Sequence, residues 1–266
     1  MYDDKRGSTE VEEFIAAVEG RREPHERKIL ERANHVFNLY CKMRCHLRNS
    51  PLSVEDLFPV DPETIVRHVL EINYFEVDKI EGYDEFKGSQ KSMTEIAGLI
   101  DRLQDKIVIA KKFKPEWRRY TGAHEIAHYV LHPDVTLLRE RAVYLRERPV
   151  TGHEREHLKR PPEEKEADTF GAELLMPTSH LIKTFFKRFG GPINMSRPSE
   201  VVEFWFPSVK GDIDPRLERA TKKKMIRART RLVASFSDAL FPSMVERYGV
   251  SQTAMSIQLE NLGLVF

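Results

Sequence analysis

The sequence has no marked excess of either charge, few cysteines and no long hydrophobic run. Its 43 Lys and Arg residues balance 42 Asp and Glu residues, so the formal net charge is +1. This balance excludes a global field that would attract nucleic acid or a membrane, and such contacts would need a local patch. The chain has no uninterrupted apolar run of about 18 residues and no basic-then-apolar leader at its start. We therefore expect a soluble, cytoplasmic protein with no membrane partner.

Cysteine is nearly absent. The two cysteines, Cys41 and Cys45, lie in "LYCKMRCHLR", which resembles half of a zinc knuckle. No second cysteine pair exists to complete such a site. We predict buried thiols in a reducing compartment.

The chain is long enough, at 266 residues, to bury a sizeable core. Its patterns predict a helical extension over 1–52, a central domain over 53–190 and a helical region over 191–266. In the first part, apolar residues recur at intervals of three and four, which is typical of helices that pack on the rest of the protein. These residues are Val11, Phe14, Ile15, Val18, Ile29, Ala33, Val36, Phe37 and Tyr40.

The central domain begins with a helix signal, since Asp61 is a good N-cap and Pro62 suits the first helical position. Short segments with strand character follow, namely 73–80, 95–100 and 105–112, and the last two are close enough in sequence to pair. A helix is expected to start near Pro115. The charged stretch 137–164 is predicted to be an exposed insertion, and a further helix is predicted to stop at Pro177.

The motif H-E-x-x-H occurs twice, in "TGAHEIAHYVLHPD" (121–134) and in "TGHEREHLKR" (151–160). Histidines four residues apart point to one side of a helix and can each give a neutral nitrogen to Zn²⁺, while the glutamate acts on a water molecule. Such a helix lies buried under a cleft, so the positions between the ligands should be uncharged.

The residues between the histidines distinguish the two copies. The first copy has Ile126 and Ala127 there, which fits a buried helix. The second has Arg155 and Glu156, whose unpaired burial would cost several kcal/mol. We therefore predict a metal site at the first copy and exposure of the second. The predicted site comprises His124, Glu125 and His128, and the predicted exposed histidines are His153 and His157.

A catalytic zinc also needs a third protein ligand and an open position for water. The metzincin continuation fails here, because Leu131 replaces its glycine and Asp134 stands in place of its last histidine. Asp134 is a minor candidate ligand. The stronger candidate lies in "EEKEADTFGAELLMP" (163–177), where a helix would place Glu164 and Asp168 along one face.

In that segment, the Glu164 carboxylate could reach the metal, and Asp168 could accept the free N–H of a ligating imidazole and fix its tautomer. Gly171 would let the helix approach closely. Glu163 and Glu166 are rival ligands. The alternative interpretation is an amphipathic helix whose acidic start is solvated at the positive end of its dipole.

Together, "YTGAHEIAHYVLH" and "EEKEADTFGAELLMP" resemble the ImmA/IrrE family of gluzincin-type metallopeptidases. That family joins H-E-x-x-H-Y to E-x-x-A-N-x-F-A-x-x-L-L-M-P, and the resemblance covers about residues 60–181. Two departures are Asp168 for asparagine and Gly171 for alanine, and Glu164 follows His128 only after 36 residues. Position by position, the resemblance implies one Zn²⁺ per chain with His124, His128 and Glu164 as ligands and Glu125 as the catalytic glutamate.

The resemblance also implies a fold and a mechanism. The fold class is α+β, with a mostly helical, zincin-like metallopeptidase domain over 53–190, a small β-sheet beside the active-site helix and helical extensions at both ends. An extended peptide would add as a strand to the sheet edge. Glu125 would activate water and deliver a proton to the leaving amine. The oxyanion donor stays open among Tyr120, Tyr129, His132, Tyr144, His153 and His157.

Family members often cleave helix-turn-helix repressors, so the resemblance suggests a transcriptional repressor as the substrate. A second hypothesis is a regulatory or antitoxin-like binding protein in which the zinc site is structural or vestigial and the basic helix predicted over 216–232 docks the partner. The intact Glu125 favours the peptidase, because a purely structural site has no need of a general base.

The C-terminal region has the pattern of a helix-turn-helix, with Ser243 and Glu246 as a capping box, Gly249 as a turn and Ser251 as an N-cap. Residues 249–266 contain no Lys or Arg, so this pair is a poor reader of DNA. The preceding segment 216–232 holds eight basic residues and is predicted to be a helix with a solvated face. Nucleic-acid binding is therefore not expected, although this basic helix leaves it open. Its predicted apolar stripe comprises Leu217, Thr221, Met225, Ala228 and Leu232.

Overall fold

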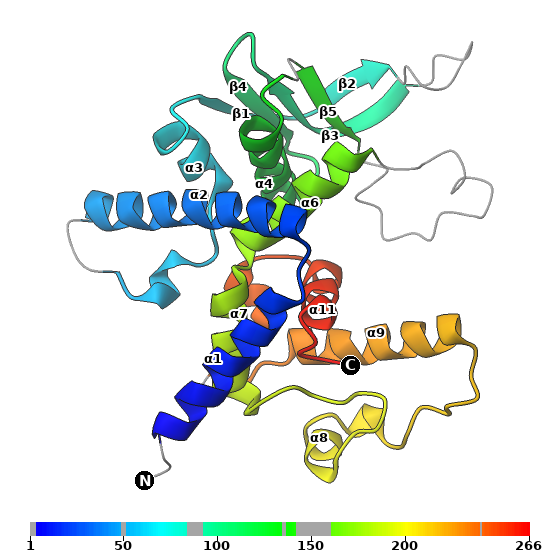
Figure 1. Cartoon of the computed structure of the whole chain (residues 1–266). Helices are drawn as coiled ribbons and strands as arrows, with labels where there is room; N and C mark the ends of the chain where they lie inside the picture. The colour runs from blue at the N-terminus through cyan, green and yellow to red at the C-terminus, as the bar shows by residue number, and fades with distance from the viewer. Residues whose placement is uncertain (1–3, 49–51, 84–92, 135–136, 142–160, 240) are drawn as a thin grey trace. The chain divides into compact units, whose positions relative to one another are not determined.

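The computed structural model describes residues 4–48, 52–83, 93–134, 137–141, 161–239 and 241–266 (Figure 1). Among the helices in these ranges, none combines the length and the apolar character that a bilayer crossing requires. The helices are α1 (Asp4–Gly20), α2 (Pro24–Arg48), η1 (Val54–Leu57), α3 (Pro62–His68), α4 (Pro115–Leu131), α6 (Pro162–Leu175), α7 (Thr178–Phe189), α8 (Glu200–Trp205), η3 (Pro207–Val209), α9 (Arg219–Ser235), α10 (Met244–Tyr248) and α11 (Gln252–Asn261). The strands are β1 (Asn73–Val77), β2 (Ile80–Tyr83), β3 (Met93–Asp101), β4 (Lys106–Ala110) and β5 (Leu137–Arg141).

The chain divides by its internal contacts into two compact units. One unit is continuous and spans 24–175, and the other combines 1–23 with 176–266. Helix α2 thus groups with the sheet, whereas α1 groups with the C-terminal helices. The division into 1–52, 53–190 and 191–266 stays a prediction from sequence pattern.

The unit 24–175 contains a mixed sheet of five described strands, with the order β1-β4-β3-β2 and with β5 also paired to β3. Strands β3 and β4 are antiparallel, with Leu99 opposite Val108, which confirms the predicted pairing of these two segments. Strand β1 runs parallel to β4. Together with the surrounding helices, this small sheet gives the mostly helical α+β, zincin-like fold that the sequence predicts.

Helix α4 is the central helix of this unit and contacts β3, β4, β5, α3 and α6. It begins at Pro115, where proline suits the first turn, and every residue from Thr121 to His128 is buried. Figure 1 shows the strands gathered on one side of α4, with α2 and α6 crossing it. Helix α3 begins as predicted, because the Asp61 side chain accepts hydrogen bonds from the amides of Glu63 and Thr64.

In the other unit, α1 packs against α7, and α9 packs against α10 and α11. The capping box, turn and N-cap predicted for the two last helices are present. Ser243 and Glu246 form the capping box, Gly249 adopts a left-handed conformation with φ of 61°, and the Ser251 side chain caps α11. Met255 and Leu259 of α11 are buried, so this helix packs inside the unit.

Three sequence expectations need correction. The charged stretch that starts at residue 137 begins with β5, which pairs with β3 and so belongs to the sheet and not to an insertion, whereas 142–160 lie outside the described residues. Cys45 is exposed and Cys41 is only half-buried, because the buried stripe of α2 runs through Ile29, Ala33, Val36, Phe37 and Tyr40 and leaves Cys45 outside it.

The third correction concerns α9, whose predicted apolar stripe faces away from the core. Met225 and Leu232 are 38% and 39% exposed, whereas Thr230, Val233 and Ala234 are buried. Thr230 tolerates burial because its hydroxyl donates to the carbonyl of Ile226 at 2.9 Å. The buried face of α9 therefore includes a polar residue, Thr230, in addition to apolar ones.

Candidate metal centre

Helix α4 supplies two imidazoles that point at each other. His124 and His128 are one helical turn apart, and their Nε2 atoms lie 3.0 Å from one another. Their side chains are only 1% and 2% exposed. Two imidazole nitrogens fixed side by side in a dry environment make an incomplete metal site.

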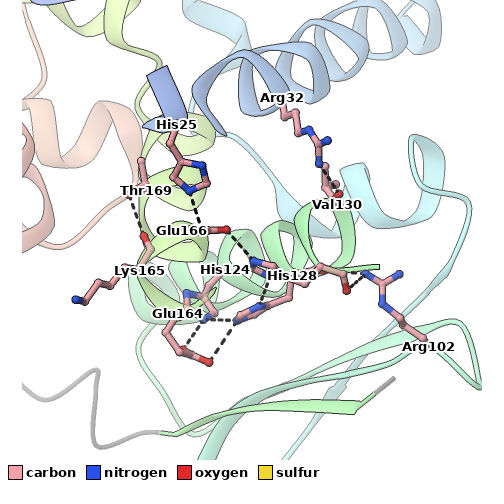
Figure 2. A network of polar contacts seen from close by, with 11 residues as sticks. His25, Arg32, Arg102, His124, His128, Val130, Glu164, Lys165, Glu166 and Thr169 are labelled. Carbon is pink, nitrogen blue, oxygen red and sulfur yellow. Dashed lines mark hydrogen bonds and ion pairs between the residues drawn. The ribbon is translucent and has the colours of Figure 1, made fainter. Parts of the chain in front are cut away.

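Helix α6 completes the cluster with a carboxylate from its first turn. Glu164 places Oε2 3.2 Å from His124 Nε2 and Oε1 3.6 Å from His128 Nε2. Figure 2 shows these contacts, with Glu164 reaching across to both rings. The three side chains offer ligand atoms that all lie within 4.8 Å of one another.

These separations fit a metal ion of zinc size. Ligand atoms about 2.0–2.2 Å from a tetrahedral zinc lie roughly 3.3–3.6 Å from one another. The observed separations of 3.0, 3.2 and 3.6 Å lie at or slightly below that range. Two imidazoles and one carboxylate also match the donor set of a catalytic zinc with one position left for water. Within the described parts of the chain, this is the one such group of His, Cys, Asp and Glu residues.

The outer nitrogen of His124 has a carboxylate partner, also from α6. Asp168 Oδ1 lies 3.2 Å from His124 Nδ1, which is the contact that the sequence suggested for Asp168. When His124 donates from Nδ1, its Nε2 lone pair is left to face the cluster. Tyr120 places its hydroxyl 3.4 Å from the same Asp168 oxygen, so this candidate oxyanion donor contacts the carboxylate.

The outer nitrogen of His128 has a longer chain of partners. His128 Nδ1 lies 2.9 Å from His132 Nδ1, and His132 Nε2 lies 3.1 Å from Glu166 Oε2. The other oxygen of Glu166 lies 2.8 Å from Nε2 of His25, in the first turn of α2 (Figure 2). Both ring nitrogens of His132, another candidate oxyanion donor, are therefore engaged.

The charge of Glu166 responds to these partners. Burial by itself raises the pKa of Glu166, but the hydrogen bonds from His132 and His25 outweigh burial and hold the pKa below its usual value. The carboxylate form therefore predominates near neutral pH.

Arg102, in the turn after β3, caps the C-terminal end of α4. The Nη2 atom of Arg102 donates to the carbonyls of His128, Tyr129 and His132 at 2.8, 2.5 and 3.0 Å. The guanidinium also lies 4.6 Å from the ring centroid of Tyr129. A cation at the carbonyl end of a helix is favourable, because it can donate hydrogen bonds to carbonyls of the last turn and lies at the negative end of the helix dipole.

Glu125 lies between the two histidines in sequence and is fully buried. It faces β3 at Gly98, where an added Cβ would stand 2.7 Å from Glu125 Oε1 and 2.5 Å from Thr121 Cγ2. The glycine thus allows the strand to pass close to the glutamate. Gly171 differs, because a Cβ there would meet the His124 amide nitrogen at 3.4 Å, which is ordinary contact. The close approach of α6 does not require that glycine.

The structure thus brings together His124, His128, Glu164 and Asp168. Two other candidate ligands, Asp134 and Glu163, are exposed and lie outside the cluster. Tyr144, His153 and His157 fall outside the described residues.

Sequence reasoning missed the contributions of Arg102, Glu166 and His25. The available signal was the position of His132 four residues after His128, which repeats the spacing of the motif. No sequence signal pointed to Arg102, whose contact with the helix end depends on the return of the chain after β3.

The comparison with known families agrees with this geometry. Residues 88–190 match the peptidase family model described as the IrrE N-terminal-like domain, and this segment includes the cluster and Glu125. No curated protein matches the chain. The match supports membership of the ImmA/IrrE family and suggests a metallopeptidase-type domain over these residues.

Proposed function

We propose that this member of the ImmA/IrrE metallopeptidase family is a zinc-dependent endopeptidase that cleaves a peptide bond in a regulatory protein. The observation that carries the proposal is the convergence of His124, His128 and Glu164, with ligand atoms within 4.8 Å of one another. These residues would hold one zinc ion per chain. The family match over the same residues supports a peptidase.

A zinc ion held there would act as a Lewis acid toward the peptide carbonyl and make water more acidic. Glu125 is the proposed general base. Its carboxylate accepts the proton of the attacking water and then donates it to the leaving amine. The complete burial of Glu125 supports this role, because a buried carboxylate is costly to maintain and a structural metal site would not need one.

Asp168 has a separate task. It accepts the Nδ1–H of His124, so the ring keeps its Nε2 lone pair toward the cluster. Because Glu164 and Asp168 lie one turn apart on α6, one rigid helix presents both the ligand and the residue that orients another ligand.

The substrate would bind as an extended strand. From Gly98 to Asp101, β3 is paired with β4 on one side and with β5 on the other. A peptide adding to this part of the sheet would therefore pair with the outer edge of β5, using main-chain hydrogen bonds. The family resemblance suggests that the protein presenting this strand is a helix-turn-helix repressor.

The alternative, a binding protein that docks its partner through the basic helix, gains no specific support. Three arginines of α9 make bonds within their own unit. Arg227 pairs with Glu260, Arg229 donates to the carbonyls of Met195 and Gly211, and Arg231 donates to Thr253. Their charges help to hold α9 against α11 and neighbouring loops.

The test measures metal and cleavage separately. We expect about one zinc per purified chain, loss of zinc in Glu164→Ala and retention in the exposed neighbour variant Glu163→Ala. The parent and Glu125→Gln are then added to an extract of the source cells, and new protein N-termini are mapped by mass spectrometry.

We expect new termini within DNA-binding regulators for the parent and none for Glu125→Gln, which should still bind zinc. Equal cleavage by Glu125→Gln would refute the assigned base. New termini only in other protein classes would refute the repressor substrate while leaving the peptidase intact.

A further inference from the structure

We propose that His132 and Glu166 are positioning residues for the metal ligand His128, with His25 as the outer member of the same chain of hydrogen bonds. This inference rests on the proposed zinc site and adds residues that hold one of its ligands in place. The four side chains come from α2, α4 with its C-cap, and α6, and they are linked by contacts of 2.9, 3.1 and 2.8 Å (Figure 2).

The direction of the hydrogen bonds follows from the chemistry of the outer members. A carboxylate can only accept, so His132 donates from Nε2 to Glu166. A neutral imidazole that carries its proton on Nε2 has a lone pair on Nδ1. The Glu166 carboxylate therefore sets the tautomer of His132.

The tautomer of His132 in turn sets the tautomer of the metal ligand His128. His132 Nδ1 lies 2.9 Å from His128 Nδ1, on the side of His128 away from the other ligands, so a proton and not a metal ion joins these two nitrogens. With His132 as the acceptor, His128 donates from Nδ1 and keeps its Nε2 lone pair toward His124 and Glu164. Such orientation of a ligating imidazole fixes its ring and raises its basicity.

The two ligand histidines thus depend on different carboxylates of one helix. His124 contacts Asp168 directly, whereas His128 reaches Glu166 through His132. Exposure rises along the second path, from 2% for the His128 side chain to 9% for His132, 25% for Glu166 and 71% for His25. The inner members are shielded from competing water, so we expect their removal to matter more than that of His25.

The experiment measures zinc affinity, which does not depend on peptidase activity. The full chain is stripped of metal, and its zinc Kd is determined by competition with a chromogenic chelator. We expect His132→Ala and Glu166→Ala each to weaken zinc binding by about 10–100-fold, the typical effect of removing such a partner. The matched control is Glu163→Ala, which removes an exposed glutamate from the same turn of α6 and should leave the Kd unchanged.

Conservative variants separate positioning from a general structural role. His132→Asn keeps an oxygen acceptor near the place of Nδ1, and Glu166→Gln keeps a carbonyl that accepts from His132. Each should recover part of the affinity lost in the corresponding alanine variant. Urea unfolding of the metal-free proteins shows whether any variant destabilises the fold itself.

The outcomes distinguish this inference from the proposed function. If the parent binds zinc, Glu164→Ala abolishes binding and both His132→Ala and Glu166→Ala retain the parent Kd, then the positioning role is wrong and the zinc site stands. A second result would also overturn the inference. In it, the zinc affinity of the variants falls only as far as the urea stability of the metal-free proteins falls, and neither His132→Asn nor Glu166→Gln recovers affinity. If the parent itself binds no zinc, both proposals fail together.

Discussion

Substitution of Gly98 by alanine tests how tightly β3 packs on the site helix. The added Cβ would lie 2.5 Å from Thr121 Cγ2, 2.7 Å from Glu125 Oε1 and 3.1 Å from Glu125 Cγ. Carbon atoms normally approach to about 3.5–4.0 Å, so the methyl group of Thr121 would be about 1 Å too close. Something in this part of the core has to move.

The backbone has little freedom to retreat. Gly98 is paired with Ile109 of β4 and with Glu140 of β5, and α4 is buried where it faces the strand. The side chains of Thr121 and Glu125 are therefore expected to rotate away from the added methyl. Overpacking of this kind typically destabilises a protein by about 1–3 kcal/mol. A displacement of about 1 Å at a catalytic group can lower the rate about 100-fold.

We expect Gly98→Ala to lower the free energy of unfolding by about 1–3 kcal/mol and to reduce peptide hydrolysis about 100-fold. Zinc should be retained, because the closest atoms belong to Thr121 and Glu125 and to neither histidine. Urea unfolding, zinc content and the appearance of new N-termini give the three readouts.

Two glycines serve as controls for this substitution. An added Cβ at Gly20 would have no atom within 4 Å, and at Gly171 its closest contact would be an ordinary 3.4 Å. Both alanine variants should unfold within about 1 kcal/mol of the parent. A Gly98→Ala protein with the stability and the hydrolysis rate of the parent would refute the packing argument.

Three further predictions follow from single side chains. Arg102→Ala removes a charged donor from three carbonyls at the end of α4 and should destabilise the metal-free protein by about 1.5–3 kcal/mol in urea; an unchanged midpoint would contradict the capping role. Burial and the neighbouring Cys45 raise the pKa of Cys41 to about 11, so iodoacetamide should modify the exposed Cys45 faster near neutral pH, as followed by peptide mass spectrometry. Burial and two nearby cations lower the pKa of His180 below 6.5, so its neutral form supports the fold above that pH and stability is lost as the pH falls. His180→Gln should flatten this fall in the urea midpoint, and an unchanged slope would show that other groups cause it.

Much of the helical structure could be predicted because its signals are local. The cap at Asp61, the start of α4 at Pro115 and the turn at Gly249 each depend on neighbouring backbone groups, and the structure has all three. The strand β5 was missed because its charged sequence shows no apolar alternation, and its place in the sheet comes from pairing with β3. The buried face of α9 was assigned wrongly for a related reason, since the packing partner and not the stripe decides which side is covered.

The sequence by itself determined the core of the candidate site. In an α-helix, residues four apart share a face, so the spacing of His124 and His128 together with uncharged neighbours was enough to place two imidazoles side by side in a buried helix. The sequence also favoured Glu164 through its helical relation to Asp168.

Only the tertiary structure decided which groups surround those imidazoles. Packing of α6 on α4 selects Glu164 as the carboxylate of the cluster and directs Glu166 to His132 instead. The clearance between Gly98 and Glu125 likewise depends on how β3 crosses α4. Contacts between residues distant in sequence depend on the packing of whole elements, and the local spacing that forms each helix does not specify that packing.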